Sequence, residues 1–221
     1  MMITNWTRVG VYLSGLGAAL LFFSESGSAA ESSLLRAKLS VVQTGADFFR
    51  FFNFSPIGKE KLPDGTTVIS FKPTGDAFRA LVTLRVTTND EGIIKKLDLV
   101  VARSFIDDPK NCVYAADLVK SFLTDAAATT EGDDVSLLAA EINARSMARS
   151  TTTVIVARPL PATPGLPSAA YQTYAGSPQP QTLLYPSRKE QVLLRNDTQS
   201  SKSTLDIIVS ATADSMQPSH L

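Results

Sequence analysis

Histidine and cysteine are almost absent from this chain of 221 residues. The single histidine, His220, is the second-last residue, and the single cysteine is Cys112. Catalytic triads with a histidine base, cysteine–histidine pairs and histidine-rich metal sites therefore cannot be assembled on ordered structure. One cysteine also excludes an internal disulfide, so the fold must be stabilised by its core. We expect neither a metal site nor a cofactor.

Motifs of the common enzyme classes are missing as well. After residue 30 the chain contains no G-x-S-x-G, no Walker loop and no S-x-x-K. The acid pairs Asp107–Asp108 and Asp133–Asp134 stand at expected helix starts, where carboxylates cap free backbone N–H groups. Capping is therefore favoured over catalysis, and we expect the protein not to be an enzyme.

Positive charge is not concentrated anywhere in the chain. The 21 basic residues are balanced by 21 acidic ones, and the basic doublets at 95–96 and 188–189 are short. Binding to phosphate groups depends on a clustered positive surface. A nucleic-acid partner is therefore not expected.

The first thirty residues have the layout of a secretory signal peptide. Arg8 precedes an uncharged apolar run over residues 9–23, and small residues follow up to Ala30. A run of this length is shorter than the about 20 residues that a membrane-spanning helix needs. Cleavage after Ala29 or Ala30 is favoured, and the protein is expected to be periplasmic or secreted. The alternative is a membrane anchor through residues 9–23, if they are left uncleaved.

Two stretches of alternating apolar residues predict an antiparallel hairpin in the middle of the chain. They cover residues 80–86 and 97–105 and flank a turn that ends in Gly92. The length of the turn places Leu84 opposite Leu97, which gives one continuous apolar face.

Charged residues of this hairpin are expected on both of its faces. Arg85 would lie opposite Lys96 and diagonal to Asp98, and the diagonal pair is expected to be solvated. Arg103 instead falls on the apolar face of the second strand. A buried Arg103 would need an anionic partner, either Asp107 or a ligand, and a structural ion pair is favoured.

A helix is expected to follow the hairpin directly. Asp107 or Asp108 can accept hydrogen bonds from its first free N–H groups, and Pro109 suits the first helical position. Apolar residues then recur at helical spacing, so one helix face should pack on the hairpin. This stripe consists of Cys112, Ala115 or Ala116, Val119, Phe122 or Leu123, and Ala126.

The remaining patterns complete an α+β domain with an antiparallel sheet of about five to six strands and two or three helices packed on it, preceded by a signal peptide. Residues 1–30 are the signal peptide, and 31–221 form the single domain. Residues 55–64 have the proline and glycine of a connecting loop. The other expected elements are helices at 32–53 and 133–149, strands at 66–72 and 151–157, and a hairpin of 190–195 with 204–211.

A phenylalanine-rich segment, residues 48–54, is the first candidate for binding. Its five rings include Phe51 and Phe52. Exposed aromatic patches mark contacts with partners or membranes, whereas buried rings supply core area. Burial is favoured for the segment, and contact remains the alternative.

A proline-rich stretch, residues 159–186, is the second candidate. It holds seven of the twelve prolines, together with Tyr171 and Tyr174. Such proline density prevents helix and central strand, which predicts an extended excursion over the surface. The tyrosines could bind a partner, although packing of the loop onto the domain is favoured.

These observations lead to two functional hypotheses. The first is an exported, non-enzymatic protein that binds an unknown protein partner or envelope component. The alternative is a hydrolase in the periplasm or outside the cell that uses carboxylates and arginine, with Asp98, Arg103 and Asp107 around a cleft. The candidate binding residues are Arg103, Asp107, Phe51, Phe52, Tyr171 and Tyr174.

Overall fold

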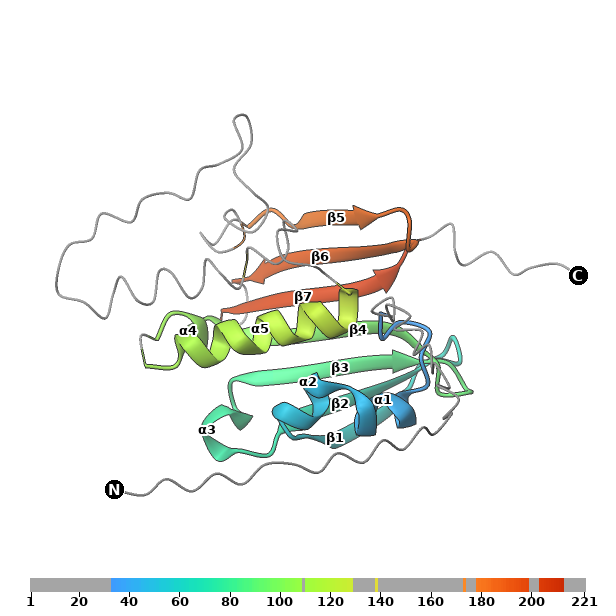
Figure 1. The fold of residues 1–221 in the computed structure, drawn as a ribbon, viewed down its shortest axis with the longest axis horizontal. Helices are drawn as coiled ribbons and strands as arrows, with labels where there is room; N and C mark the ends of the chain where they lie inside the picture. The colour runs from blue at the N-terminus through green and yellow to red at the C-terminus, as the bar shows by residue number, and fades with distance from the viewer. Residues whose placement is uncertain are drawn as a thin grey trace, which may run out of the picture. The chain divides into compact units, whose positions relative to one another are not determined.

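Hydrogen bonds join seven antiparallel strands into one sheet in the computed structural model, which describes residues 33–108, 110–128, 138, 173, 178–198 and 203–212. Their spatial order is β1-β2-β3-β4-β7-β6-β5 (Figure 1). The strands are β1 (Phe54–Lys61), β2 (Thr67–Pro73), β3 (Val82–Thr88), β4 (Ile94–Ala102), β5 (Gln181–Tyr185), β6 (Glu190–Asp197) and β7 (Thr204–Ala211).

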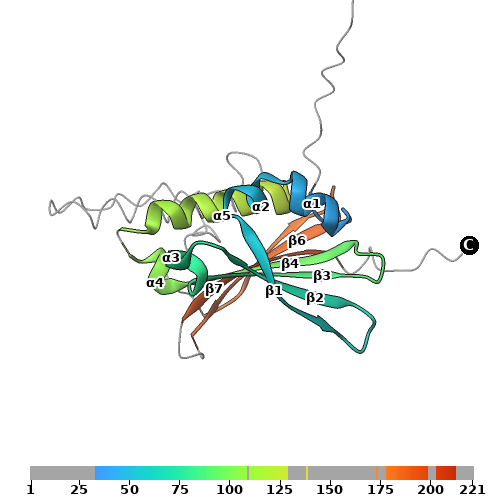
Figure 2. The same ribbon diagram turned by 90° about the horizontal axis from the view of Figure 1, so that it is seen from below.

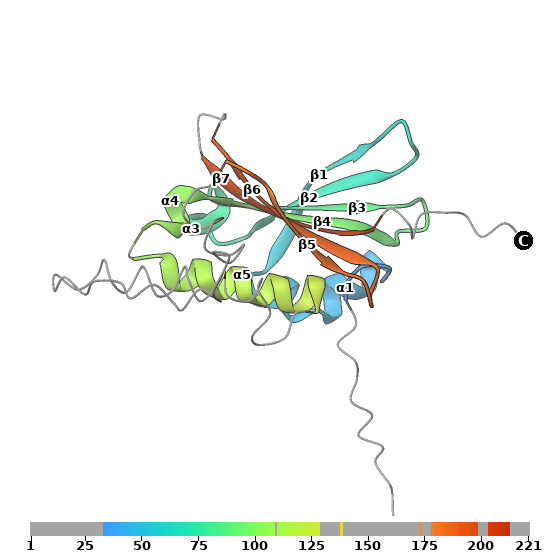
Figure 3. The ribbon, with the colours of Figure 1, turned by 90° about the horizontal axis from the view of Figure 1, so that it is seen from above.

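Five helices are described around this sheet. The longest of them, α5, lies with α1 and α2 along one face of the sheet (Figures 2 and 3). The short helix α4 follows directly on the end of β4, and α3 begins after Thr74 and Gly75, which follow β2. The bounds are α1 (Leu39–Gly45), α2 (Asp47–Phe51), α3 (Asp76–Arg79), α4 (Arg103–Ile106) and α5 (Cys112–Ala127).

The predicted α+β class and antiparallel sheet are confirmed, but the sheet has more strands than expected. One additional strand is β1, in the stretch expected to be a loop. Most of its side chains are exposed, and Pro56 and Gly58 flank an irregularity in its pairing with β2. An edge strand of this kind shows no apolar alternation. Similarly, β5 occupies 181–185, at the end of the expected surface excursion.

The register of the predicted hairpin is wrong by two residues. Leu84 pairs with Leu99, and Arg85 lies directly opposite Asp98 rather than Lys96. The turn is longer than expected, with a bulge at Thr87 and Thr88. A shift by two residues keeps each side chain on its face, so alternation along the strands cannot detect it.

Two of the expected helices also differ from the structure. The single helix expected at 32–53 is broken at Ala46, whose extended backbone separates α1 from α2. The middle helix starts at Cys112 with Asn111 at the N-cap, not at the Asp107–Asp108–Pro109 corner. Asp107 instead follows the last residue of α4.

The core lies between the helices and the sheet. The predicted stripe of α5 is buried from Ala115 to Ala126 and packs with the inward residues of β3, β4, β6 and β7. Phe48 and Phe49 of α2 are also buried, and the Phe48 ring lies 5.3 Å from that of Phe122. The predicted pairing of residues 190–195 with 204–211 is confirmed by β6 and β7.

Several expected elements lie outside the described residues. They are the signal peptide, the strand at 151–157 and most of the helix at 133–149, of which Leu138 is described as helical and fully buried. The described residues belong to one compact unit, residues 31–221. Within this described part, no helix is both long and apolar enough to span a bilayer.

Candidate functional site

An aromatic pocket of about 340 Å³ opens where the turn between α2 and β1 meets α3, α4 and α5. Five aromatic rings contribute to it, from four separate parts of the sequence. The lining consists of Phe51, Phe52, Asn53, Pro73, Thr74, Gly75, Phe78, Val82, Phe105, Tyr114 and Leu118.

The turn between α2 and β1 is held by Asn53. Its backbone has a φ of 48°, in the left-handed region that asparagine tolerates better than most residues. Its side-chain amide donates to Thr74 Oγ1 at 2.7 Å, and its carbonyl accepts from the Thr74 N–H at 3.1 Å. These bonds place the end of α2 beside the end of β2, which forms one wall of the aromatic pocket.

Helix α2 divides the phenylalanine-rich segment between core and surface. Phe48 is 1% exposed, whereas Phe51, three residues later, is 85% exposed. The Asp125 carboxylate of α5 accepts a hydrogen bond from the Phe48 N–H at 2.8 Å, in the first turn of α2. Asp125 therefore fixes the side of α2 that faces the core, and Phe51 is left at the mouth of the aromatic pocket.

Another part of the lining is a cluster of three rings from different helices. The Phe78 ring of α3 lies 5.2 Å from Phe105 of α4 and 5.7 Å from Tyr114 of α5. Aromatic contacts at such distances stabilise the relative placement of the helices. Tyr114 is 56% exposed. Phe51 and Tyr114 are therefore two exposed rings in the lining of an apolar cavity.

The chemistry of the lining is almost entirely apolar. None of the lining residues is charged, and Asn53 and Thr74 are hydrogen-bonded to each other. No group of three or more histidine, cysteine, aspartate or glutamate residues in the described part of the chain could hold a metal ion. The aromatic pocket is therefore suited to an apolar group, because a polar or charged ligand would lose its hydration without compensation.

Arg103 and Asp107 lie together in and just after α4. Arg103 is not on a strand as expected, because β4 ends at Ala102. Its Nη2 lies 3.4 Å from Asp107 Oδ1, and this pair spans one helical turn. The expected ion pair is thus present, and neither residue lines the aromatic pocket.

Asp98 lies apart from these two residues, in the middle of β4. The neighbouring Leu97 and Leu99 point into the core, so the Asp98 side chain is on the opposite face of the sheet. It pairs with Arg85 at 3.4 Å but is only 7% exposed, so the expectation of a solvated pair is wrong. The cause is the third strand, β7, which pairs with β4 on its other side.

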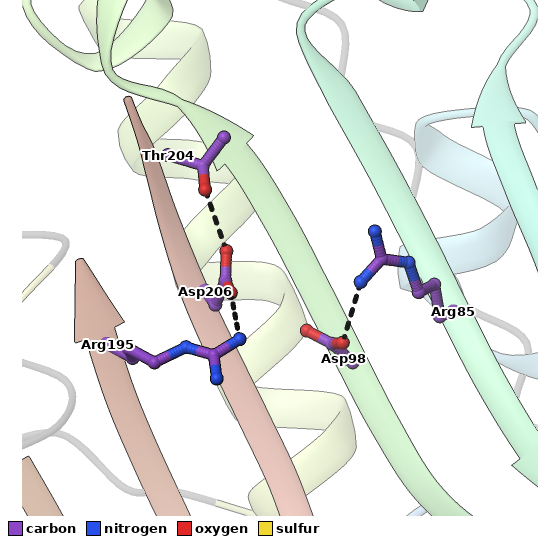
Figure 4. A network of polar contacts seen from close by, with 5 residues as sticks. All are labelled: Arg85, Asp98, Arg195, Thr204 and Asp206. Carbon is purple, nitrogen blue, oxygen red and sulfur yellow. Dashed lines mark hydrogen bonds and ion pairs between the residues drawn. The ribbon is translucent and has the colours of Figure 1, made fainter. Parts of the chain in front are cut away.

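Asp98 belongs to a polar network across four strands (Figure 4). On β7, Asp206 accepts hydrogen bonds from Arg195 Nη2 at 2.6 Å and from Thr204 Oγ1 at 3.0 Å. Burial raises the pKa of the Asp98 carboxyl, and the negative charge of Asp206 raises it further. The network is therefore a buried acid pair flanked by arginines.

Of the six predicted binding residues, Phe51 and Phe52 are in the aromatic pocket. Tyr171 and Tyr174 lie outside the described residues. Sequence reasoning missed the three-ring wall of Phe78, Phe105 and Tyr114. Each is a single aromatic residue in its own segment, so no local pattern distinguishes it.

Comparison with known proteins identifies no family for this chain. The chain matches no protein-family model, no curated protein and no solved structure.

Proposed function

We propose that this is an exported, non-enzymatic protein that binds a protein partner by accepting the partner's apolar side chains in the aromatic pocket. The observation that carries the proposal is the combination of an uncharged aromatic cavity with the exposed rings of Phe51 and Tyr114 at its mouth. Export is proposed from the signal-like pattern of residues 1–30.

The size of the aromatic pocket favours side chains over lipid. At about 30 Å³ for each small non-hydrogen group, the cavity of about 340 Å³ has room for roughly eleven such atoms. This corresponds to one aromatic side chain together with one branched aliphatic side chain. The acyl chain of a membrane phospholipid is longer and would protrude from the cavity.

The exposed rings support the same assignment. Energetic hot spots of protein interfaces are enriched in aromatic anchors that surround or fill pockets, because each ring buries a large apolar area at low cost in side-chain entropy. Phe51 and Tyr114, two exposed rings of the lining, supply such anchors. A partner that inserts apolar side chains would bury both rings.

The hydrolase alternative has less support. Asp98 lies on the face of the sheet opposite to the core, and Arg103 and Asp107 are paired at α4. None of the three lines the aromatic pocket. The aromatic pocket therefore does not bring these groups together.

Selection from a displayed peptide library tests the proposal with a defined probe. We expect the wild-type protein to enrich peptides with an aromatic residue close to Leu or Ile. Gly75→Leu should abolish the enrichment by filling the cavity. Gly75 lines the aromatic pocket, its φ is −67°, and a Cβ there meets no atom within 4 Å, so the variant should fold.

Gly45→Leu is the matched control. A Cβ at Gly45 also meets no atom within 4 Å, but Gly45 ends α1 and is not part of the aromatic pocket. We expect it to select the same peptides as the wild type, whereas Phe51→Ala should lose them. Equal enrichment by Gly75→Leu and Gly45→Leu, or selection of polar peptides, would contradict the proposal. Saturable binding of a fluorescent fatty acid that Gly75→Leu abolishes would instead identify lipid as the occupant.

A further inference from the structure

The polar network of Figure 4 lies at the junction between the two halves of the sheet. Strands β1 to β4 precede α5 in the sequence, and β5 to β7 follow it, so β4 and β7 form the only hydrogen-bonded seam between the halves in the described part of the chain. Asp98 of β4 pairs with Ile208, and Asp206 of β7 pairs with Val100. The two acids are therefore diagonal neighbours on the same face of the seam.

One carboxylate oxygen of this acid pair lacks a hydrogen-bond donor. Asp98 Oδ2 pairs with Arg85, whereas Asp98 Oδ1 is buried and has no hydrogen-bond partner among the described residues. Figure 4 shows this second oxygen on the side that faces β7. A buried ionised oxygen without a donor costs free energy, and a bound proton removes that cost by neutralising the group.

The charges around Asp98 come from every strand of the network. Asp206 on β7 disfavours ionisation of Asp98, and it does so together with burial. The cations that favour ionisation are Arg85 on β3, Lys96 on β4 and Arg195 on β6. Arg195 is engaged by Asp206 at 2.6 Å, and the Arg85 side chain is half exposed to water. The pairing of Arg195 with Asp206 and the exposure of Arg85 to water both weaken the electrostatic stabilisation of an ionised Asp98.

We infer that Asp98 and Asp206 form a pH-sensitive pair at the seam between the two halves of the sheet, in which Asp98 binds a proton through Oδ1 as the medium becomes acidic. Proton binding removes the repulsion between the two acids and the unpaired buried charge. The seam is therefore held more tightly in acid than at neutral pH. This inference is independent of the aromatic pocket, which lies elsewhere on the fold.

Comparison of the wild type with Asp98→Asn over a range of pH tests the inference. Asparagine resembles the protonated acid in shape and charge. The folded-state pKa of Asp98 lies above its unfolded value, so the wild type binds more protons when folded and loses stability as pH rises through this window. From urea unfolding between pH 3 and 8, we expect the folding equilibrium constant of Asp98→Asn relative to wild type to rise by up to about tenfold per pH unit. The rise should begin near pH 3.8 and stop above the folded-state pKa.

Two further measurements separate the acid pair from other causes. The same comparison in an Asp206→Asn background should show a smaller rise, since the neighbouring charge has been removed. Asp90→Asn, which removes an exposed acid paired with Lys61, should not produce the rise. Carbon-13 NMR titration of the Asp98 carboxyl in the unmodified protein requires no variant to fold. A midpoint at or below 3.8, or a relative stability of Asp98→Asn that falls with pH, would overturn the inference.

Discussion

Replacing Phe48 and Phe51 by alanine, one at a time, compares two identical side chains of one short helix that differ only in their surroundings. Phe48 is 1% exposed and contacts the rings of Phe49, Phe52, Phe54 and Phe122. Phe51 is 85% exposed. We therefore expect a large loss of stability for Phe48→Ala and almost none for Phe51→Ala.

The magnitude follows from burial and from how well the site can collapse. Truncation of a buried Phe to Ala typically costs about 3–5 kcal/mol, and the cost increases with the cavity that remains. Rings surround Phe48 from α2, β1 and α5, so they cannot all move inward, and we expect a value in the upper part of this range. Phe51→Ala should change the free energy of unfolding by no more than about 0.5 kcal/mol.

Urea unfolding followed by far-UV circular dichroism measures both values, since the only tryptophan, Trp6, lies in the predicted signal peptide. Phe48→Leu serves as a control that keeps most of the apolar volume, and it should cost clearly less than Phe48→Ala. The reasoning would be refuted if the two alanine variants lost similar stability, or if Phe48→Ala cost less than about 1 kcal/mol. Of these two alanine variants, Phe51→Ala is the one that should fail in the peptide selection while remaining fully folded.

Two further predictions concern polar contacts. Asp125→Ala removes the cap on the Phe48 N–H and should lower the free energy of unfolding by about 1 kcal/mol, whereas Asp125→Asn keeps an acceptor and should lose less. Arg195→Ala leaves Asp206 buried without its cation and should cost about 1–3 kcal/mol at neutral pH. Urea unfolding measures both, and a neutral result for Arg195→Ala would show that solvent replaces the arginine.

Much of the sheet could be predicted because its inner strands alternate regularly. The core residues of β3, β4 and β7, together with the buried stripe of α5, follow from periods of two and about 3.6 residues. The edge strand β1 could not be predicted in this way. Its side chains are mostly exposed on both faces, and Pro56 and Gly58 resemble the residues of a loop.

The register of the central hairpin shows where local reasoning stops. Alternation decides which face a side chain occupies, but every even shift satisfies it equally. The observed shift depends on the turn, where the Asn89 side chain accepts from the Ile93 N–H at 2.8 Å and a bulge absorbs an extra residue. This shift places Arg85 opposite Asp98 and thereby creates the ion pair.

Only part of the candidate site could be predicted from the sequence. Phe51 and Phe52 attracted attention as part of a run of aromatic residues, yet the run itself does not show which rings are exposed. That depends on Asp125, more than seventy positions away, which orients α2. The rings of Phe78, Phe105 and Tyr114 meet only because α3, α4 and α5 converge.

By itself, the sequence determined the α+β class, the inward faces of the inner strands and the buried stripe of α5, because these depend on residues close together in the chain. It also determined which side chains are scarce, since the sequence contains one histidine and one cysteine. Only the tertiary structure decided the register, the aromatic pocket and the burial of Asp98 beside Asp206. Each of these depends on contacts between segments far apart in the chain, and the periodicity within one segment carries no information about its distant neighbours.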